Sequence, residues 1–290
     1  NGTRIIWPES ATSKELWVSG DGPDRSLGSV DIVFPILHGP FGEDGTIQGM
    51  LELYALPYVG SKVLASSVGM DKHFTKTLLQ AAGIAVAPWR TVTRHEWQKH
   101  PLAIRAMAEQ MTLPVFTKPA RAGSSVGVSK VSDWNDFADA MDVAFAEDDH
   151  VLIEEGMSGR EIECAVLEAL PGEPTRASVA GEIVVSGREF YDFEAKYLGA
   201  EGIDLVCPAP LEPEQLAELQ RLSIRAFDAI GASGLARVDF FLTDQGFVVN
   251  EINTMPGFTP ISMFPRCWQE SGMGYSELID ELIQVALARH

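Results

Sequence analysis

Hydrophobic and polar residues follow different spacings along the chain, and the first part predicts helices around one buried strand. Residues 30–37 form a largely apolar run rich in branched side chains, which is typical of a strand buried on both faces. The run ends in HGPFGEDG, at the strand end where open α/β sheets bind ligands. A helix is expected near residues 46–56, and another begins after Asp71, a residue suited to a helix N-cap, and ends at Gly83.

Helices and strands alternate in the middle of the chain. A polar stretch between Pro88 and Pro114 contains a helical pattern, and LPVFTKP has the composition of a strand. ARAGSSVGVSKV is expected to form a loop followed by a second strand, and DWNDFADAMDVAFAEDD is expected to form a helix.

Short strands dominate from residue 151 onward. VLIEEGM, EIECAVLEAL and TRASVAGEIVV are strand-like, and helices are expected at residues 212–230 and 275–287. These patterns predict an α/β protein that becomes α+β in its C-terminal part. Boundaries are expected near residues 65 and 153, whereas the length of 290 residues alone suggests roughly two domains.

Two strand-like runs near the C-terminus, LARVDFFL and FVVNEIN, are separated by TDQG and predict a β-hairpin. If the turn is centred on Gln245, Asp239 lies opposite Glu251. In the same register, Arg237 lies opposite Asn253. Because side chains alternate between the two faces of a strand, these four polar residues share one face. The other face is then expected to carry Val238, Phe240, Val248 and Ile252.

The opposed carboxylates of Asp239 and Glu251 suggest a metal site. Directly opposite side chains lie roughly 4.5–5.5 Å apart at Cβ, and like charges there are destabilising without a cation between them. Mg²⁺ takes oxygen ligands and commonly binds one or two carboxylates together with substrate phosphates. Asp239, Glu251 and Asn253 are therefore a candidate ligand set. Alternatively, the carboxylates point into water or pair with Arg237, and a register shift of one residue would spoil the geometry.

A glycine- and serine-rich segment, KPARAGSSVGVSK, holds Lys118, Arg121 and Lys130 around small residues. Backbone N–H groups of such a loop can close around phosphate oxygens, and Lys118 could add a positive charge. The segment matches neither the Walker A nor the GxGxxG pattern, so by itself it is a weak nucleotide signal. An exposed hairpin turn explains it equally well.

Two other matches to catalytic motifs do not fit their surroundings. Residues 123–127 match GxSxG, but the hydrolase motif needs a helix after the serine, and VGVSKV is β-branched and strand-like. His95 and His100 resemble an HExxH zinc motif, but their spacing would place them on different faces of a helix.

Charge and cysteine content argue against several classes of function. Acidic side chains number 41 against 22 basic ones, and the formal charge of −19 would repel a nucleic acid. The three cysteines are widely spaced and form no CxxC pair, which favours buried thiols in a reducing cytosol over a zinc site or a disulfide framework. No apolar run approaches the roughly 18 residues of a membrane span, and no signal-peptide pattern opens the chain. A cytoplasmic protein without membrane contact is therefore expected.

Seven segments occur in the order and wording of one enzyme family. They are HGPFGEDGTIQG, GMDKHFTK, FTKPARAGSSVGVSKV, IEEGMSGREIE, FYDFEAKY, LARVDFF and NEINTMPGFT, and they run from about Val30 to the C-terminus. The chain thereby resembles the D-alanine–D-alanine ligases, which are ATP-grasp enzymes of peptidoglycan precursor synthesis. The resemblance implies an N-terminal α/β substrate domain (1–65), a central ATP-grasp subdomain (66–153) and a C-terminal catalytic domain (154–290).

The resemblance also implies which residues bind ATP and magnesium (or manganese). Asp239, Glu251 and Asn253 match the metal ligands of the family. Lys72 and Lys118 match the lysines that hold the ATP phosphates. The other implied ATP contacts are Glu154, Glu155 and the backbone near Met157 at the adenine, and Glu161 at the ribose.

Catalytic roles follow from the same resemblance. Arg237 and the backbone N–H of Gly257 match the donors that stabilise an oxyanion. Ser124 and Tyr197 belong to a hydrogen-bonded set that positions a loop over the site.

Substrate contacts are implied as well. Lys196 and Ser262 match contacts to the carboxylate of the second substrate, and His38 lies where the first D-alanine is approached. The segment EFYDFEAKYLG is the candidate lid, because it concentrates ionisable residues, although a strand of core aromatics would explain it too.

The implied activity is the ATP-dependent joining of two D-alanines through an acyl phosphate, by a protein that is a homodimer in its family. Tyr197 within EAKY favours this dipeptide product over the alternatives, in which D-lactate or D-serine is the second substrate. A nucleotide-binding pseudoenzyme is a more distant alternative. It is disfavoured by a complete set of chemical residues: Lys118, Arg237, Asp239, Glu251 and Asn253.

One feature departs from the family. The family opens with a glycine-rich strand and turn whose glutamate contacts the first substrate, and no counterpart precedes Val30. We expect this segment to be missing from the printed sequence rather than from the protein. An intact mass near 31.6 kDa together with no turnover would contradict that expectation.

Overall fold

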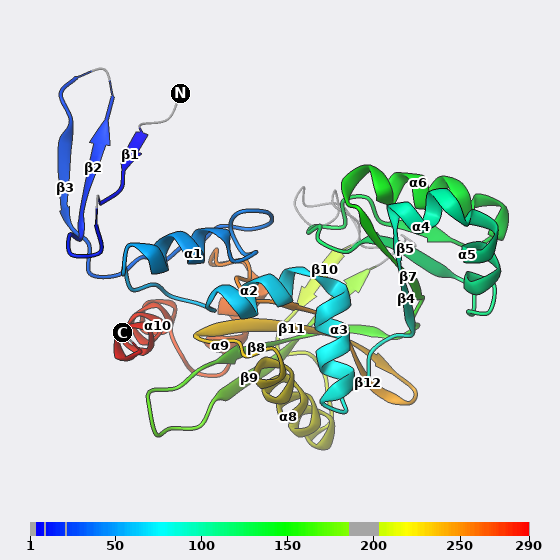
Figure 1. The fold of residues 1–290 in the computed structure, drawn as a ribbon. Helices are drawn as coiled ribbons and strands as arrows, with labels where there is room; N and C mark the ends of the chain where they lie inside the picture. Colours follow the sequence, from blue (N-terminus) through cyan, green and yellow to red (C-terminus); the bar gives the residue numbers. More distant parts are fainter. Residues whose placement is uncertain (1–3, 9, 21, 186–202, 290) are drawn as a thin grey trace.

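The computed structural model describes residues 4–289 except 9, 21 and 186–202, and the strands of the described residues form three sheets (Figure 1). Every ladder within these sheets is antiparallel, and helices pack against the two larger sheets. This arrangement agrees with the mixed helix and strand composition predicted from the sequence. Among the described residues, no helix has both the length and the apolar character needed to cross a bilayer.

The N-terminal sheet is a small antiparallel unit at one end of the molecule (Figure 1). Its strands are β1 (Arg4–Ile6), β2 (Glu15–Ser19) and β3 (Arg25–Ser29). Three helices follow in sequence, namely α1 (Thr46–Leu53), α2 (Val63–Met70) and α3 (Lys72–Ala81). The Asp71 carboxylate accepts hydrogen bonds from the N–H groups of His73 and Phe74, so the predicted N-cap is confirmed.

The predicted buried strand at residues 30–37 was wrong. Only Val33 pairs there, in one isolated bridge to Tyr58, and the side chains of Ile36 and Leu37 are 46% and 50% exposed. A strand buried on both faces needs hydrogen-bonded neighbours along both edges. The described residues provide a neighbour on one side only, so the apolar run remains extended chain.

A four-stranded sheet forms the central part of the chain. Its order is β4 (Trp89–Thr93), β7 (His150–Glu155), β5 (Val115–Pro119) and β6 (Ser129–Val131). One face packs on α4 (Arg94–Lys99), α5 (Pro101–Ala108), α6 (Phe137–Glu147) and the 3-10 turn Trp134–Asp136. Side chains alternate along β5 and β7, so Val115, Val151 and Ile153 enter this core while Phe116, Lys118 and Glu154 face the other way.

A five-stranded sheet forms the C-terminal part. Its order is β10 (Ile203–Val206), β9 (Arg176–Val185), β8 (Arg160–Leu167), β11 (Leu235–Thr243) and β12 (Gly246–Asn253). The helix α8 (Pro213–Ala229) covers one face together with α3. The helices α9 (Met263–Glu270) and α10 (Tyr275–Ala288) cover the other face.

The alternation along β8 shows why this sheet is buried on both faces. Ile162, Cys164 and Val166 pack with α8, whereas Ala165 and Leu167 pack with α9 and α10. The sheets would place the second domain boundary between β7 and β8, and the three-domain division stays a proposal.

The β11–β12 hairpin has the predicted register at the end that lies away from its turn. Asp239 pairs with Glu251 and Arg237 with Asn253. Nearer the turn, however, Thr243 pairs with Gly246, so the turn is one residue tighter than predicted. A β-bulge between the two registers leaves Asn250 without a Cα partner.

The bulge also corrects the predicted apolar face of β12. Val248 does not belong to the core that contains Val238, Phe240 and Ile252; Phe247 and Val249 are buried there instead. An extra residue in one strand shifts the alternation of all side chains beyond it. The sequence pattern had no means of showing where that residue would be.

Candidate active site

Two adjoining pockets lie between the central sheet and the C-terminal hairpin. The larger has a volume of about 220 Å³, and the smaller about 40 Å³. The two pockets share Lys72, Ala122, Asn250 and Glu251 in their walls. Among the predicted site residues, the larger is lined by Lys72, Lys118, Ser124, Glu154, Glu155, Met157, Glu161 and Glu251. The smaller is lined by Lys72, Glu251 and Asn253.

A buried carboxylate holds two lysines at the floor of the pockets. Phe116 on β5 pairs with Glu154 on β7, so Lys118 reaches Glu154 diagonally on the same face of the sheet. Lys118 Nζ lies 2.5 Å from Glu154 Oε1, and Lys76 Nζ from α3 lies 2.7 Å from Glu154 Oε2. Burial alone would raise the pKa of Glu154, but the two ammonium groups outweigh it and lower this pKa to about 2.

Lys72 connects the helix α3 to the glycine- and serine-rich loop. Its Nζ donates a hydrogen bond of 2.6 Å to the carbonyl of Ala122, and its backbone N–H donates one of 3.0 Å to the carbonyl of Ala120. Because Asp71 caps α3 immediately before it, the Lys72 backbone has a fixed position. The Lys72 side chain thus reaches the wall shared by both pockets.

The loop itself has an unusual backbone. Ser124 and Ser125 have φ angles of 53° and 59°, in the left-handed region that favours glycine. A non-glycine residue there costs on the order of 1–2 kcal/mol. Both serines line the larger pocket, so the strained backbone faces the site. The segment continues into β6 without a helix, unlike a hydrolase nucleophile turn.

The far wall of the larger pocket is formed where β7 ends. Glu155 Oε1 accepts a hydrogen bond of 3.0 Å from the backbone N–H of Thr112. The N–H of Gly156 donates to the carbonyl of Pro114 at 2.8 Å, which fixes the chain before Met157. Glu161, at the start of β8, completes this wall.

On the polar face of the hairpin, Glu251 and Asn253 line the pockets, whereas Arg237 and Asp239 line neither of them. Arg237 donates from Nε and Nη2 to the two carboxylate oxygens of Asp239, each at 2.7 Å, and Asn253 Nδ2 donates to Asp239 Oδ2 at 2.9 Å. Burial alone would lower the pKa of Arg237, but Asp239 and Glu163 raise it well above its usual range. The pairing of Arg237 with Asp239, considered as an alternative from the sequence, is therefore present.

The same face has the chemistry of a magnesium site. Asp239 and Glu251 are Cα partners on adjacent strands, and Asn253 adds an amide oxygen two positions further along. Carboxylate oxygens have several lone pairs, so the bonds from Arg237 do not use up the acceptor capacity of Asp239. Oxygen donors of this kind, in a wall that also contains Lys72, fit a hard divalent cation.

Three further predicted residues lie near one another after β12 and around the N-terminal loop. His38 Nδ1 donates a hydrogen bond of 3.0 Å to the carbonyl of Met255, so this nitrogen carries the proton. Ser262, the N-cap residue of α9, accepts from the N–H of Thr259 at 3.1 Å. A Cβ at Gly257 would lie 3.0 Å from Ser262 Oγ, so glycine relieves a close approach here. None of His38, Gly257 and Ser262 lines either pocket.

Comparison with known proteins identifies the family. A family model described as D-ala D-ala ligase C-terminus matches residues 78–284, and one described as D-ala D-ala ligase N-terminus matches residues 8–61. The chain belongs to the D-ala D-ala ligase family. The D-alanine--D-alanine ligase of Pseudarthrobacter chlorophenolicus is 55% identical over 268 residues, which are 91% of this chain and 70% of that protein. The same enzyme of Kineococcus radiotolerans is 48% identical over 99% of this chain and 79% of that protein.

Two solved structures of ligases resemble this family member over nearly its whole length. The D-alanine-D-alanine ligase from Coxiella burnetii has a TM-score of 0.81 at 37% identity, covering 99% of this chain and 74% of that chain. The VanG D-Ala:D-Ser ligase from Enterococcus faecalis has a TM-score of 0.85 at 34% identity, covering 98% of this chain and 79% of that chain. These neighbours have the ATP-grasp fold, in agreement with the predicted fold class.

Two residues of this ligase family member were not predicted as site residues. Lys76 lies four positions after Lys72 in GMDKHFTK, so helical spacing could have placed both on one face. Glu43 lines the smaller pocket and accepts a hydrogen bond of 2.7 Å from the Gly39 N–H. Burial raises the pKa of Glu43 to about 7, and Glu251 contributes to this increase. Lys196 and Tyr197, both predicted as site residues, lie outside the described residues.

Proposed function

We propose that this protein joins two molecules of D-alanine into D-alanyl-D-alanine, consuming ATP and forming ADP and phosphate, for the synthesis of peptidoglycan precursors. The observation that carries the proposal is the pair of joined pockets. Their common wall contains Lys72 and Glu251, and Asp239 is the Cα partner of Glu251 on the adjacent strand. Relatives at 48–55% identity named D-alanine--D-alanine ligase support the substrate.

The larger pocket fits the nucleotide. Glu155, Met157 and Glu161 form the wall proposed for the adenine and ribose. Lys118 of the central sheet lines the larger pocket and Lys72 of α3 lines both pockets, and there they would neutralise phosphate charge. Glu154 holds the Lys118 side chain in place through their ion pair, because the buried carboxylate is itself ionised.

A divalent metal would be held by Asp239, Glu251 and Asn253, and when bound it would neutralise phosphate charge during phosphoryl transfer. Such a cation would also relieve the repulsion between the two opposed carboxylates. The family implies ATP and a divalent metal, and this ligand set is our assignment for the chain.

The chemistry proposed for the chain has two steps. The carboxylate of the first D-alanine attacks the γ-phosphorus of ATP, and ADP leaves, which yields an acyl phosphate. The amine of the second D-alanine then attacks the acyl carbon, loses a proton, and phosphate leaves. Arg237 and the N–H of Gly257 would stabilise the intervening oxyanion, and a donor of this kind is worth on the order of 3–4 kcal/mol.

Substrate positions follow from the residues around the pockets. His38 would contact the first D-alanine and Ser262 the carboxylate of the second, a carboxylate also proposed for Lys196, which lies outside the described residues. Ser124 and Tyr197 would belong to one hydrogen-bonded set, and Tyr197 also lies outside the described residues. Because ATP is the phosphoryl donor, we place the reaction in the cytoplasm, and we expect a homodimer.

The direct test is product formation. The protein is incubated with ATP, MgCl₂ and D-alanine, and ADP release and dipeptide are quantified by coupled assay and mass spectrometry. We expect stoichiometric ADP and D-alanyl-D-alanine. ATP binding without D-alanine-dependent phosphate release would instead favour a nucleotide-binding pseudoenzyme.

D-serine is a second candidate for the second substrate, because the VanG D-Ala:D-Ser ligase is among the similar structures. D-lactate is tested with it, in competition with D-alanine across pH. We expect the dipeptide of D-alanine to dominate at neutral pH. A main product containing D-serine or D-lactate would overturn the choice of second substrate but leave the reaction type.

A further inference from the structure

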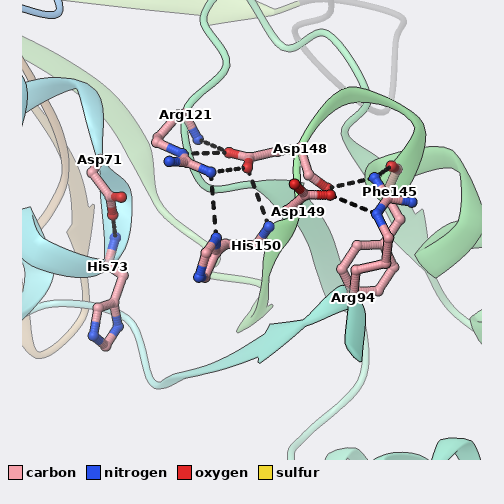
Figure 2. A network of polar contacts seen from close by, with 8 residues as sticks. All are labelled: Asp71, His73, Arg94, Arg121, Phe145, Asp148, Asp149 and His150. Atoms are coloured by element: carbon pink, nitrogen blue, oxygen red, sulfur yellow. Dashed lines mark hydrogen bonds and ion pairs between the residues drawn. The ribbon is translucent and has the colours of Figure 1, made fainter. Parts of the chain in front are cut away.

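A buried carboxylate fixes the base of the glycine- and serine-rich loop, away from the proposed site itself. Asp148 lies between α6 and β7, and its side chain is 5% exposed. Its oxygens accept hydrogen bonds from the backbone N–H of Arg121 at 2.8 Å and from Arg121 Nε at 3.1 Å (Figure 2). They also accept one from Arg121 Nη2 and one from the backbone N–H of His150 at 3.1 Å.

These bonds connect three parts of the site. Arg121 is the last residue before the loop of residues 122–128, and His150 begins β7, which carries Glu154. The carbonyl of Ala120 accepts from the N–H of Lys72, and the N–H of Ala120 donates to the carbonyl of His150. The chain at 120–121 is therefore tied to α3, to β7 and to Asp148, directly before its backbone becomes strained at Ser124.

The far end of the loop is confined by packing. Gly127 has a φ of +70°, and a Cβ there would lie 2.8 Å from Pro119 Cγ and 2.8 Å from Glu147 Cγ. Glu147 directly precedes Asp148 at the end of α6. The same turn of chain thus fixes both ends of the loop.

A neighbouring ion pair provides a contrast. Asp149 pairs with Arg94 at 2.6 Å, and the two side chains are 72% and 41% exposed (Figure 2). Asp149 has the same charge and nearly the same position as Asp148. Its partner, however, lies at the start of α4, on the side of the sheet opposite the pockets.

We propose that Asp148, through Arg121, is a positioning residue that sets the loop of residues 122–128 over the phosphates of the bound nucleotide. The inference rests on the proposed function for the identity of the ligand. A loop that binds phosphate through backbone N–H groups needs those groups aimed in advance. Asp148 accepts three hydrogen bonds from Arg121 at the start of the loop, and the Lys72 side chain adds one to the carbonyl of Ala122.

The test uses two variants of the anchor and one of the contrast pair. Arg121→Gln is the mild variant, because the Arg121 side chain is 49% exposed and the backbone bonds to Asp148 remain. Asp148→Asn is the strong variant. Asp149→Asn is the matched control, and Arg94 is left unchanged because its Nη2 also donates to the carbonyl of Asp148 at 3.3 Å. For each protein the Kd for a fluorescent ADP derivative with Mg²⁺ is measured by titration. This measurement does not depend on ligase turnover. The KM values for ATP and for D-alanine are then measured separately in the ligase assay.

We expect both anchor variants to raise the nucleotide Kd and the KM for ATP by about tenfold, with the KM for D-alanine within about twofold of wild type. The control should stay within about twofold in all three constants. Circular dichroism checks folding, and if Asp148→Asn does not fold, Arg121→Gln decides. Nucleotide affinity unchanged in a folded anchor variant, or lost equally in the control, would overturn the proposal. Wild-type protein that binds nucleotide but forms no dipeptide would refute the proposed function. The nucleotide titrations would even then test the positioning role of Asp148.

Discussion

At the scale of single residues, the charged groups at the pocket floor depend on one another. Glu154 is 3% exposed and is ionised because Lys76 and Lys118 each lie within 2.7 Å of it. Removing one member of such a group leaves a buried charge with fewer partners, which is strongly destabilising. Lys118 therefore keeps the position proposed for nucleotide binding only while Glu154 and Lys76 are both present.

The pKa of Glu154 predicts how stability depends on pH. Its folded pKa is lowered from 4.5 to about 2, so the unfolded chain takes up the proton first as pH falls. The contribution is fully present above pH 4.5 and is lost between about 4.5 and about 2. By pH 3.5 we expect a loss of about 1.4 kcal/mol in the free energy of unfolding.

Urea unfolding of wild type and Glu154→Gln at pH 6 and pH 3.5 measures this effect. The difference in stability between the two proteins should shrink by that amount at the lower pH, because glutamine does not titrate. A difference that is the same at both pH values would show that Glu154 is not ionised through its lysine partners.

At the scale of elements, the β11–β12 hairpin carries the proposed metal ligands. Glu251→Gln keeps the size of the side chain but removes one charge from the proposed metal ligands. We expect Mg²⁺-dependent turnover to fall by more than about 100-fold, since loss of a mere supporting contact to a metal ligand already costs about 10–100-fold.

Asp244→Asn is the control, because it removes a carboxylate from the exposed turn of the same hairpin. Steady-state assays with MgCl₂ titration compare the two variants, and circular dichroism confirms their fold. Wild-type rates in Glu251→Gln would remove this residue from the ligand set.

The sequence could predict those elements whose pattern is local. The Asp71 cap, the long helices and the pairing of Asp239 with Glu251 all depend on residues a few positions apart or on one turn. It could not predict the bulge at Asn250, because the strand on the other side of β11 and the packing of Phe247 and Val249 decide it. Residues 30–37 were mispredicted for a related reason, since an apolar run becomes a buried strand only where neighbours exist.

The candidate site was predictable to the extent that motifs marked it. Lysines in glycine-rich surroundings and the hairpin carboxylates stand out by residue type, and the resemblance to a family added the rest. Lys76 and Asp148 did not stand out, because a buried lysine looks like any helical lysine until Glu154 lies beside it. The proposed role of Asp148 likewise depends on its contact with Arg121, which is 27 positions away in the chain.

At the scale of the whole molecule, the nucleotide would join two sheets that contact each other sparsely. Outside the pockets, the segment before β4 meets the C-terminal sheet through a bridge between Val86 and Val249, where the Val249 N–H donates to the carbonyl of Ala85 at 2.9 Å. A ligand held by both sheets should stabilise the folded protein through its preference for the native state.

Thermal unfolding measures this stabilisation. At 100 times its Kd, ADP with Mg²⁺ should add about 2.7 kcal/mol, which corresponds to a rise in Tm of about 5–10 °C. ADP with EDTA is the control and should give a smaller rise. Equal shifts with and without the metal would mean that nucleotide binding does not involve the hairpin carboxylates.

The bulge in β12 has a consequence for how this strand can change. Asn250 and Glu251 are consecutive, yet both line the two pockets, whereas neighbours on a regular strand point in opposite directions. Deleting one residue at this position would straighten the strand. Either Glu251 would then turn into the apolar layer beneath α3 and α8, or Phe247 and Val249 would turn out of it. The extra residue therefore allows Glu251 to line the pockets while Phe247 and Val249 stay in the core.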